Sequence, residues 1–375
     1  MKRKRVYAFL LAAVTATGLM AGCGQGGNQD AKNAVVNTGE NGTEELQQED
    51  TEVIGTEDAD ASQEEVETPA YPEILSDETI EDYGSVVRVG DAAYELYTYL
   101  DDVAETYATS VNTVAKNLDG QCTVYDLVIP LGSGIIFPDN LRDQIKSGDQ
   151  QEAIQNIQGK MDPSVQFVDI YDTLMTHRNE YIYFRTDHHW TALGAYYAYT
   201  DFCSVKGIEP EAIESYTTKE FDGFLGSFYN DTNEDSKLGD NPDVVTAYEP
   251  NMDAICHIED SRGIQYDSPV IYDETNAAAG LKYSAFIAGD NPYTEIVNNE
   301  LTDGSSCIVV KESFGNAFVP FLVDHYQTIY VVDYRYWTGS ISELAAEKGV
   351  QDVIFVNNLS MIRNKSLVGK LFRLL

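Results

Sequence analysis

The sequence is poor in histidine, tryptophan and positive charge. It holds five His and two Trp in 375 residues, and its 24 Lys and Arg face 62 Asp and Glu, for a formal charge of -38. Such an acidic chain argues against nucleic acid and other phosphate-rich polymers as partners, because these bind through Lys and Arg. The sequence also contains no glycine-rich phosphate-binding loop, so we expect no nucleotide or flavin cofactor.

Cysteine is scarce, and its spacing is uninformative. Cys122, Cys203, Cys256 and Cys307 are far apart and form no Cys-x-x-Cys pair, which argues against a zinc site. Most of them stand in apolar segments, where Cys behaves as a small hydrophobic residue. We therefore expect free thiols rather than a disulfide framework, and no metal centre built on cysteine.

Long apolar runs are absent except near the N-terminus. Four cations in residues 1–5 precede an uncharged, mostly apolar stretch, residues 6–22, which is at the short end of the roughly 20 residues that span a bilayer. The stretch ends in Met-Ala-Gly-Cys and resembles a bacterial lipobox. We expect residues 1–22 to be a lipoprotein signal peptide and Cys23 to be lipidated, which would hold the protein on the extracytoplasmic face of the cell membrane. An ordinary signal peptide or an uncleaved anchor helix are the alternatives.

The next segment is strongly acidic. Residues 24–80 contain 16 Asp and Glu against one Lys and show no apolar periodicity. A segment of this composition cannot bury enough apolar surface to offset the entropy of ordering it. We predict that residues 23–82 are a disordered tether, with an acidic binding tail as the alternative, and that the folded domain occupies residues 83–375.

Hydrophobic patterning in this domain predicts an α/β fold with a parallel sheet. The expected strands are residues 86–89, 122–131, 165–171, 306–311, 328–333 and 352–356. The expected helices are residues 92–118, 150–160, 192–205, 314–326 and 340–348. Residues 207–285 contain short β-like runs between Gly, Asp and Asn turns, and we expect an insertion of strands and loops there.

The C-terminal third reads as β-α-β-α-β, and ligands bind at the carboxyl ends of parallel strands. Three pairs of polar or aromatic residues stand at those ends, namely Glu312-Ser313, Tyr334-Arg335 and Asn357-Asn358. We therefore expect a hydroxyl, a guanidinium and amide groups to converge on one edge of the sheet.

Two of the five histidines are adjacent, in Asp187-His188-His189-Trp190. A serine hydroxyl needs a base to take its proton, and an acidic group fixes the orientation of that base. Asp187 and His189 could supply these groups for Ser313. The alternatives are helix N-caps for Asp187 and Ser313 and a structural role for His188. A metal site on Asp187, His188 and His189 is disfavoured, because adjacent side chains rarely converge on one ion.

These residues carry a resemblance to the DHHW family of bacterial secreted proteins, which is similar to the alginate O-acetyltransferases. The resemblance covers roughly residues 86–375 and implies a circularly permuted, SGNH-hydrolase-like, three-layer fold of the flavodoxin type. Asp187, His189 and Trp190 match the first motif, and Ser313 in Lys-Glu-Ser-Phe-Gly-Asn matches the nucleophile. Lys311-Glu312 replaces the Gly-Asp that usually precedes such a serine. No clean asparagine block is present either.

Together with the lipobox-like segment, the resemblance implies a lipid-anchored serine enzyme that transfers O-acetyl groups to or from a polysaccharide. Ser313 would be the nucleophile, His189 the base and Asp187 its partner. The Ser313 N–H with Asn357 or Asn358 would form the oxyanion hole, and Arg335 and Trp190 would contact substrate. No cofactor or metal is implied, and the expected partners are the polysaccharide, the membrane and a membrane-bound acyltransferase. The rival hypotheses are an inactive carbohydrate-binding lipoprotein and a transporter's solute-binding lipoprotein; the absence of an internal repeat disfavours the latter.

Overall fold

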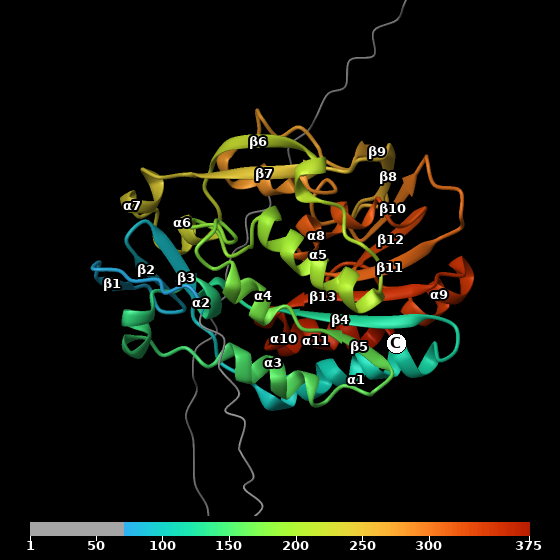
Figure 1. Ribbon diagram of the computed structural model, residues 1–375, viewed down its shortest axis with the longest axis horizontal. Coiled ribbons are helices and arrows are strands. Elements are labelled where there is room, and N and C mark those ends of the chain that lie inside the picture. Colours follow the sequence, from blue (N-terminus) through green and yellow to red (C-terminus); the bar gives the residue numbers. More distant parts are fainter. Residues whose placement is uncertain (1–70) are drawn as a thin grey trace, which may run out of the picture. The chain divides into compact units, whose positions relative to one another are not determined.

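The computed structural model describes residues 71–375, and its centre is an eight-stranded sheet (Figure 1). In chain order its strands are β4 (Thr123–Ile129), β5 (Val165–Val168), β8 (Ala254–Glu259), β9 (Gln265–Pro269), β10 (Tyr293–Asn298), β11 (Ser306–Lys311), β12 (Thr328–Asp333) and β13 (Asp352–Asn358). In space they follow the order β5-β4-β13-β11-β12-β10-β8-β9. The predicted α/β class is confirmed.

The sheet is mixed rather than wholly parallel. Strands β5, β4, β13, β11 and β12 pair in parallel, while β10 joins β12 antiparallel and continues antiparallel through β8 and β9. Strands β11 and β13 are buried along their whole length, as expected for parallel strands covered on both faces. Because β11, β13 and β12 are parallel neighbours, their carboxyl ends lie at one edge of the sheet.

Helices cover both faces of the parallel strands. The helices are α1 (Asp101–Asn117), α2 (Gly132–Ile135), α3 (Gln150–Gln158), α4 (Tyr171–Thr176), α5 (Ala192–Lys206), α6 (Ser227–Asp231), α7 (Ser236–Gly239), α8 (Gly315–Leu322), α9 (Ile341–Lys348), α10 (Leu359–Ile362) and α11 (Lys365–Leu371). Helices α1 and α11 lie below the sheet in Figure 1, and α5 and α8 lie above it. The predicted helices at residues 150–160, 192–205, 314–326 and 340–348 are confirmed, apart from their ends.

The expected helix at residues 92–118 was too long at its N-terminal end. Its first residues form β3 (Ala92–Glu95), which pairs antiparallel with β2 (Val86–Val89), and Gly90 makes the intervening turn with φ of +61°. The helix itself begins at Asp101. Two aspartates in the first turn favour this start, because negative charge is stabilised at a helix N-terminus.

The described residues extend upstream of the expected domain boundary at residue 83. Strand β1 (Ile80–Asp82) falls inside the expected tether but pairs antiparallel with β2. Further upstream, the Tyr71 hydroxyl donates to Asp172 at 2.5 Å. The rest of the tether, the signal peptide and Cys23 lie outside the described residues.

The region predicted as an insertion, residues 207–285, divides into two parts. Strands β6 (Thr217–Phe224) and β7 (Asp243–Glu249) form a separate antiparallel pair, and β7 contacts α5 and α8. Strands β8 and β9 instead extend the central sheet, and the short helices α6 and α7 were not expected. The sequence pattern did not distinguish strands of the separate pair from strands of the main sheet.

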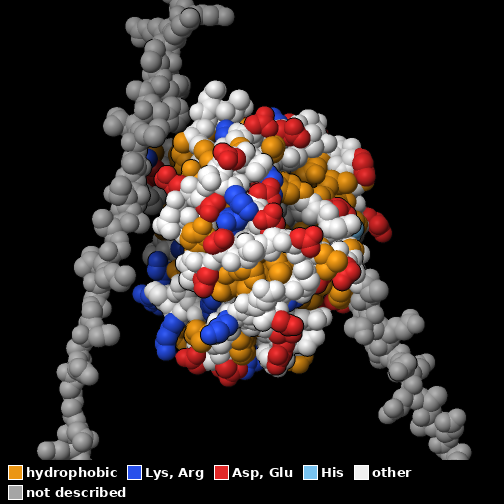
Figure 2. Space-filling model, turned by 90° about the vertical axis from the view of Figure 1, so that its left-hand side faces the viewer, with side chains coloured by type: hydrophobic (Ala, Val, Ile, Leu, Met, Phe, Trp, Pro, Cys, Tyr) orange, Lys and Arg blue, Asp and Glu red, His pale blue; other side chains and the backbone are white. Residues whose placement is uncertain are grey.

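Four cysteines lie among the described residues, and no disulfide joins them. Cys122, Cys203, Cys256 and Cys307 are free, as expected. Figure 2 shows acidic and basic side chains interspersed with hydrophobic ones on the face that it displays. Among residues 71–375, no helix is both long and apolar enough to cross a membrane.

Candidate functional site

The Asp-His-His-Trp segment forms a loop that is held at its base by an isolated antiparallel bridge between Tyr183 and Trp190. The next residue, Thr191, caps α5, because its hydroxyl accepts the Gly194 N–H at 3.3 Å. Asp187 is therefore not the N-cap of α5, and its carboxylate is available for contacts inside the loop.

Ser313 lies between β11 and α8, in a tight turn. A Cβ added to Gly315 would lie 2.6 Å from the Cβ of Lys311, so a glycine is needed for the turn to close over the strand end. Helix α8 has no side-chain cap, and the residue at its N-cap position is Phe314. Ser313 is therefore not a helix cap, which was the alternative to a chemical role.

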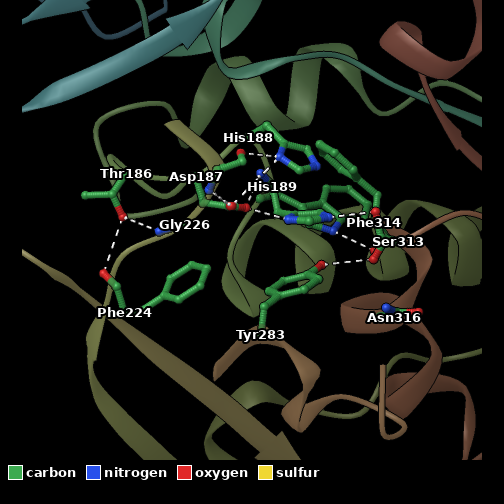
Figure 3. A network of polar contacts seen from close by, with 12 residues as sticks. Thr186, Asp187, His188, His189, Phe224, Gly226, Tyr283, Ser313, Phe314 and Asn316 are labelled. Atoms are coloured by element: carbon green, nitrogen blue, oxygen red, sulfur yellow. Dashed lines mark hydrogen bonds and ion pairs between the residues drawn. The ribbon is translucent and has the colours of Figure 1, made fainter. Parts of the chain in front are cut away.

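The two loops bring three predicted residues into contact, as Figure 3 shows. The Ser313 Oγ lies 2.8 Å from Nε2 of His189, and Nδ1 of His189 lies 2.5 Å from Oδ1 of Asp187. The exposed fractions are 8%, 7% and 5% for Ser313, His189 and Asp187. In the tautomer with the proton on Nδ1, His189 donates to Asp187 and its Nε2 can accept the serine proton. The three side chains form a serine–histidine–aspartate relay.

Asp187 is held in its ionised form. Its burial favours the neutral acid, but His188, His189 and the Ser227 N–H outweigh this effect and hold the pKa of Asp187 well below its usual range. The Ser227 N–H donates to Oδ2 at 2.7 Å, and the His189 N–H donates to Oδ1 at 3.0 Å. A fixed negative charge therefore faces Nδ1 of His189, as a relay requires.

His188 has a different set of contacts. Its Nδ1 lies 2.6 Å from the Ser227 Oγ, and its ring lies against that of His189 with centroids 3.9 Å apart. Burial and the neighbouring His189 lower its pKa. Ligand atoms of Asp187, His188 and His189 lie within 4.8 Å of one another, but both Asp187 oxygens and the two Nδ1 atoms already have hydrogen-bond partners within the protein.

Aromatic rings fix the plane of the His189 imidazole. Tyr283 stacks on it with centroids 4.0 Å apart and an interplanar angle of 14°, and Phe314 lies on it at 5.0 Å. The Tyr283 hydroxyl also donates to the Ser313 carbonyl at 3.3 Å. Tyr283 thus contacts both the base and the turn that carries the serine.

Trp190 is fully buried, and the substrate contact expected for it stays a prediction. Its side chain is 0% exposed, and its indole N–H donates to the Phe314 carbonyl at 2.9 Å. A buried indole needs such a partner, and here the partner belongs to the serine turn. Trp190 therefore joins the histidine loop to the Ser313 turn.

The two asparagines expected at the oxyanion hole differ in their contacts. The Asn357 Nδ2 donates to the Tyr107 hydroxyl at 3.3 Å, on the face covered by α1. The Asn358 Oδ1 accepts the N–H groups of Ser360 and Met361, so it caps α10. Its Nδ2 is buried and has no hydrogen-bond partner among the described residues. Of the two amide nitrogens, only that of Asn358 has no hydrogen-bond partner at all among the described residues.

Arg335 belongs to a buried ion-pair cluster. Its guanidinium contacts Asp333 at 2.6 Å and Asp290 at 2.8 Å, and Lys311 contacts the same two carboxylates at 3.1 and 3.4 Å. Although burial opposes ionisation of Asp290, Lys311 and Arg335 hold the pKa of Asp290 well below its usual range. The substrate contact predicted for Arg335 stays a prediction. Lys311, which departs from the family pattern, forms ion pairs within this cluster.

Sequence reasoning did not predict four residues that lie against these three side chains. They are Gly226, Ser227, Tyr283 and Glu312. The first three belong to the inserted region and carry no recognisable motif. Ser227 lies 40 residues from Asp187 in the chain. Glu312 was noticed only as a departure from the family pattern.

Comparisons with known proteins identify the family of the chain. The family described as DHHW protein matches residues 36–332 of the chain. A DHHW family protein of known crystal structure, from Eubacterium siraeum, is 29% identical with a TM-score of 0.71, and the match covers 80% of this chain and 99% of that one. None of the curated proteins matches the sequence.

A more distant structure shares the fold. PatB1 of Bacillus cereus, in a structure with a sulfonyl adduct, is 18% identical with a TM-score of 0.63, and the match covers 79% of this chain and 99% of that one. The O-acetyltransferase domain of Pseudomonas putida AlgJ is 12% identical over 75% of this chain and 96% of that one, and its TM-score of 0.42 is too low for an inference. The family match spans most of the chain, so this protein belongs to the DHHW family.

Proposed function

We propose that the protein is an extracytoplasmic serine enzyme that transfers O-acetyl groups to or from a polysaccharide. The observation that carries the proposal is the continuous contact from Asp187 through His189 to Ser313 at the carboxyl edge of a largely parallel sheet. The order in the chain, with Asp and His before the serine, supports a circularly permuted SGNH-hydrolase-like arrangement.

The geometry supports acyl transfer in two steps. As the Ser313 Oγ attacks an acetyl ester carbonyl, its proton passes to Nε2 of His189, and a tetrahedral oxyanion forms. The Ser313 N–H and the Asn358 Nδ2 would donate to this oxyanion. Collapse of the intermediate expels the alcohol, which takes the proton from His189, and leaves an acetyl-serine.

The second step reverses the proton movements. A sugar hydroxyl or a water molecule gives its proton to His189 and attacks the acetyl-serine, which regenerates Ser313 and releases an acetylated sugar or acetate. The same relay therefore serves a transferase or an esterase, and only the acceptor differs.

The inactive carbohydrate-binding alternative depended on Lys311 and Glu312, which replace the usual residues before the serine. Lys311 points into the ion-pair cluster, and Glu312 accepts the Phe314 N–H of the turn. Both are accommodated while Ser313 and His189 remain in contact, so no observation favours this alternative over the enzyme.

A sulfonyl fluoride, which captures activated hydroxyl groups, tests the proposal. We expect the mature protein to gain one sulfonyl group at Ser313 by mass spectrometry, and p-nitrophenyl acetate hydrolysis to fall with the same kinetics. Ser313→Ala should abolish labelling, and His189→Ala should slow it by about 100-fold or more, since a general base contributes roughly 10²–10⁴-fold.

His257→Ala is a matched control. His257 also has a carboxylate partner, Asp267 at 2.7 Å, but this pair is exposed on the sheet. The control should label at the wild-type rate. A folded wild-type protein that neither labels nor hydrolyses acetyl esters would overturn the enzyme proposal. Acetylated oligosaccharide formed only when an acceptor is present would identify a transferase.

A further inference from the structure

Glu312 is a buried carboxylate directly beside the proposed nucleophile. It is 0% exposed, and none of the ion pairs found within residues 71–375 includes it. Burial raises its pKa, and the Arg335 charge and the N–H groups of Phe314 and Asn358 oppose that rise. A buried carboxylate is costly unless its oxygens accept hydrogen bonds, so its contacts indicate why it is placed there.

The two oxygens of Glu312 bind different segments. Oε2 accepts the Phe314 N–H at 3.2 Å and lies 3.3 Å from the Ser313 Oγ, whereas Oε1 accepts the Asn358 N–H at 3.1 Å. One side chain therefore joins the serine turn after β11 to the end of β13. The parallel pairing of these strands stops at Lys311 and Val356, so the backbone ladder does not hold these two ends together.

The contact with Asn358 matters because of the amide at that position. The Asn358 Oδ1 is fixed by two N–H groups of α10, and its backbone N–H is fixed by Glu312. Only Nδ2 is left without a partner among the described residues, although it is buried. A buried donor that is held rigidly and left free is suited to receive a charge that develops during a reaction.

The contact with Ser313 orients the hydroxyl. Its single proton has two acceptors within reach, Nε2 of His189 at 2.8 Å and Oε2 of Glu312 at 3.3 Å. The shorter contact favours His189 as the acceptor. The longer contact restricts rotation of the hydroxyl, so that its oxygen stays beside the imidazole between turnovers.

We propose that Glu312 is a positioning residue that sets the distance and orientation between Ser313 and the free amide of Asn358. This inference rests on the proposed acyl-transfer function. Glu312 takes no proton during the reaction, and its effect passes through the serine turn and through Asn358. Glutamate suits this position better than the shorter aspartate, because one carboxylate must reach both strand ends.

Two substitutions separate the effect of side-chain length at Glu312 from the effect of its charge. Glu312→Asp keeps the charge but is one methylene shorter, and Glu312→Gln keeps the length but presents an NH₂ group to one of the N–H donors. We expect each to lower kcat for p-nitrophenyl acetate by about 10- to 100-fold, since a misplacement near 1 Å has effects of that size. KM should stay within about threefold, because the acetyl group itself loses no contact.

A double-mutant cycle tests the route through Asn358. Asn358→Ser removes the free amide but retains an N-cap for α10, and we expect it to lower kcat by about 10²-fold. In that background Glu312→Asp should cost about threefold or less, because contacting residues that act together are not additive. The proposal would be overturned if Glu312→Asp lowered kcat by the same factor with and without Asn358→Ser. Wild-type kcat in both Glu312 variants would overturn it as well.

Asp352→Asn controls for loss of a buried charge. Asp352 lies at the other end of β13, where it pairs with Lys206 and Tyr326, and its variant should lose stability but keep kcat. Comparing variants by near-ultraviolet circular dichroism and urea unfolding separates misfolding from mispositioning. If wild-type protein itself fails to react at Ser313, the proposed function is wrong; if it reacts and the Glu312 variants match it, only the positioning role is wrong.

Discussion

At the scale of single residues, a buried cluster of polar side chains lies where helix α1 packs on strands β4 and β13. The Tyr107 hydroxyl donates to Oδ1 of Asp126 at 2.5 Å and accepts the Nδ2 of Asn357 at 3.3 Å. The Asp126 Oδ2 and the Asn357 Oδ1 are both buried acceptors without a donor among the described residues. Asp126 and Asn357 are diagonal neighbours on paired strands. A proton on Oδ2 of Asp126 would remove one of these unpaired acceptors and would supply a donor on the strand next to Asn357.

This arrangement predicts a pH-dependent stability. Burial raises the pKa of Asp126 to about 7, so its contribution is fully present below the unfolded pKa of about 3.9 and is lost as the pH rises through the folded value. Wild-type protein should lose up to about 1.4 kcal/mol of unfolding free energy per pH unit in this window. Asp126→Asn supplies a donor that does not titrate, and its variant should lack this loss.

Urea unfolding at several pH values between 4 and 8 measures this difference. Asp143→Asn, on the exposed surface, controls for the change in net charge and should follow the wild type. Parallel pH profiles for Asp126→Asn and wild type would contradict a protonated Asp126.

At the scale of elements, the site depends on a turn supplied by the inserted region. Gly226 precedes α6, and its N–H donates to the Thr186 hydroxyl at 3.2 Å. The next residue, Ser227, donates its N–H to Asp187 and lies against His188. The insertion therefore supplies part of the environment that keeps Asp187 ionised, in addition to strands that extend the sheet.

Gly226→Ala tests this dependence. A Cβ at Gly226 would lie 2.1 Å from Oδ2 of Asp187 and 2.4 Å from its Cγ, so either the carboxylate or the turn must move. We expect sulfonyl labelling of Ser313 to slow by about 10²-fold. The measurement is the rate of inactivation by the same sulfonyl fluoride.

Gly369→Ala is the corresponding control, because a Cβ there meets nothing within 4 Å. It should leave the labelling rate unchanged. A wild-type rate in Gly226→Ala would show that the inserted turn adapts and that Asp187 does not depend on it.

At the scale of the whole molecule, the location of the protein stays a proposal. The lipobox-like end of the apolar run predicts a lipid on Cys23, and the donor of acetyl groups would then be met at the membrane face. We expect Cys23→Ala to move the protein from the membrane fraction to the soluble fraction. Polymer acetylation should fall, while hydrolysis of p-nitrophenyl acetate by Ser313 stays unchanged.

Fractionation, metabolic labelling with a fatty acid and the two activity assays measure these outcomes together. A Cys23→Ala variant that stays in the membrane fraction would argue for an uncleaved anchor helix instead. Equal loss of both activities would mean that the cysteine matters for folding or export rather than for placing the enzyme beside its donor.

The sequence by itself determined the parts of the protein that depend on local pattern. Continuous apolar runs predicted β11, β12 and β13, because strands buried on both faces need them. The turns after these strands, together with the Asp-His-His-Trp run, pointed to Ser313, His189 and Asp187. The helical spacing of apolar residues gave a wrong prediction at Ala92–Glu95, because these residues pair with β2 as a strand.

Only the tertiary structure decided which residues complete the site. Ser227 and Tyr283 come from the inserted region, and Glu312 reaches Asn358 across 46 residues of sequence. Trp190 is a buried link to the Phe314 carbonyl. Such contacts join distant segments and leave no periodic trace in the sequence, because a hydrogen bond needs only one suitable atom at the right place in space.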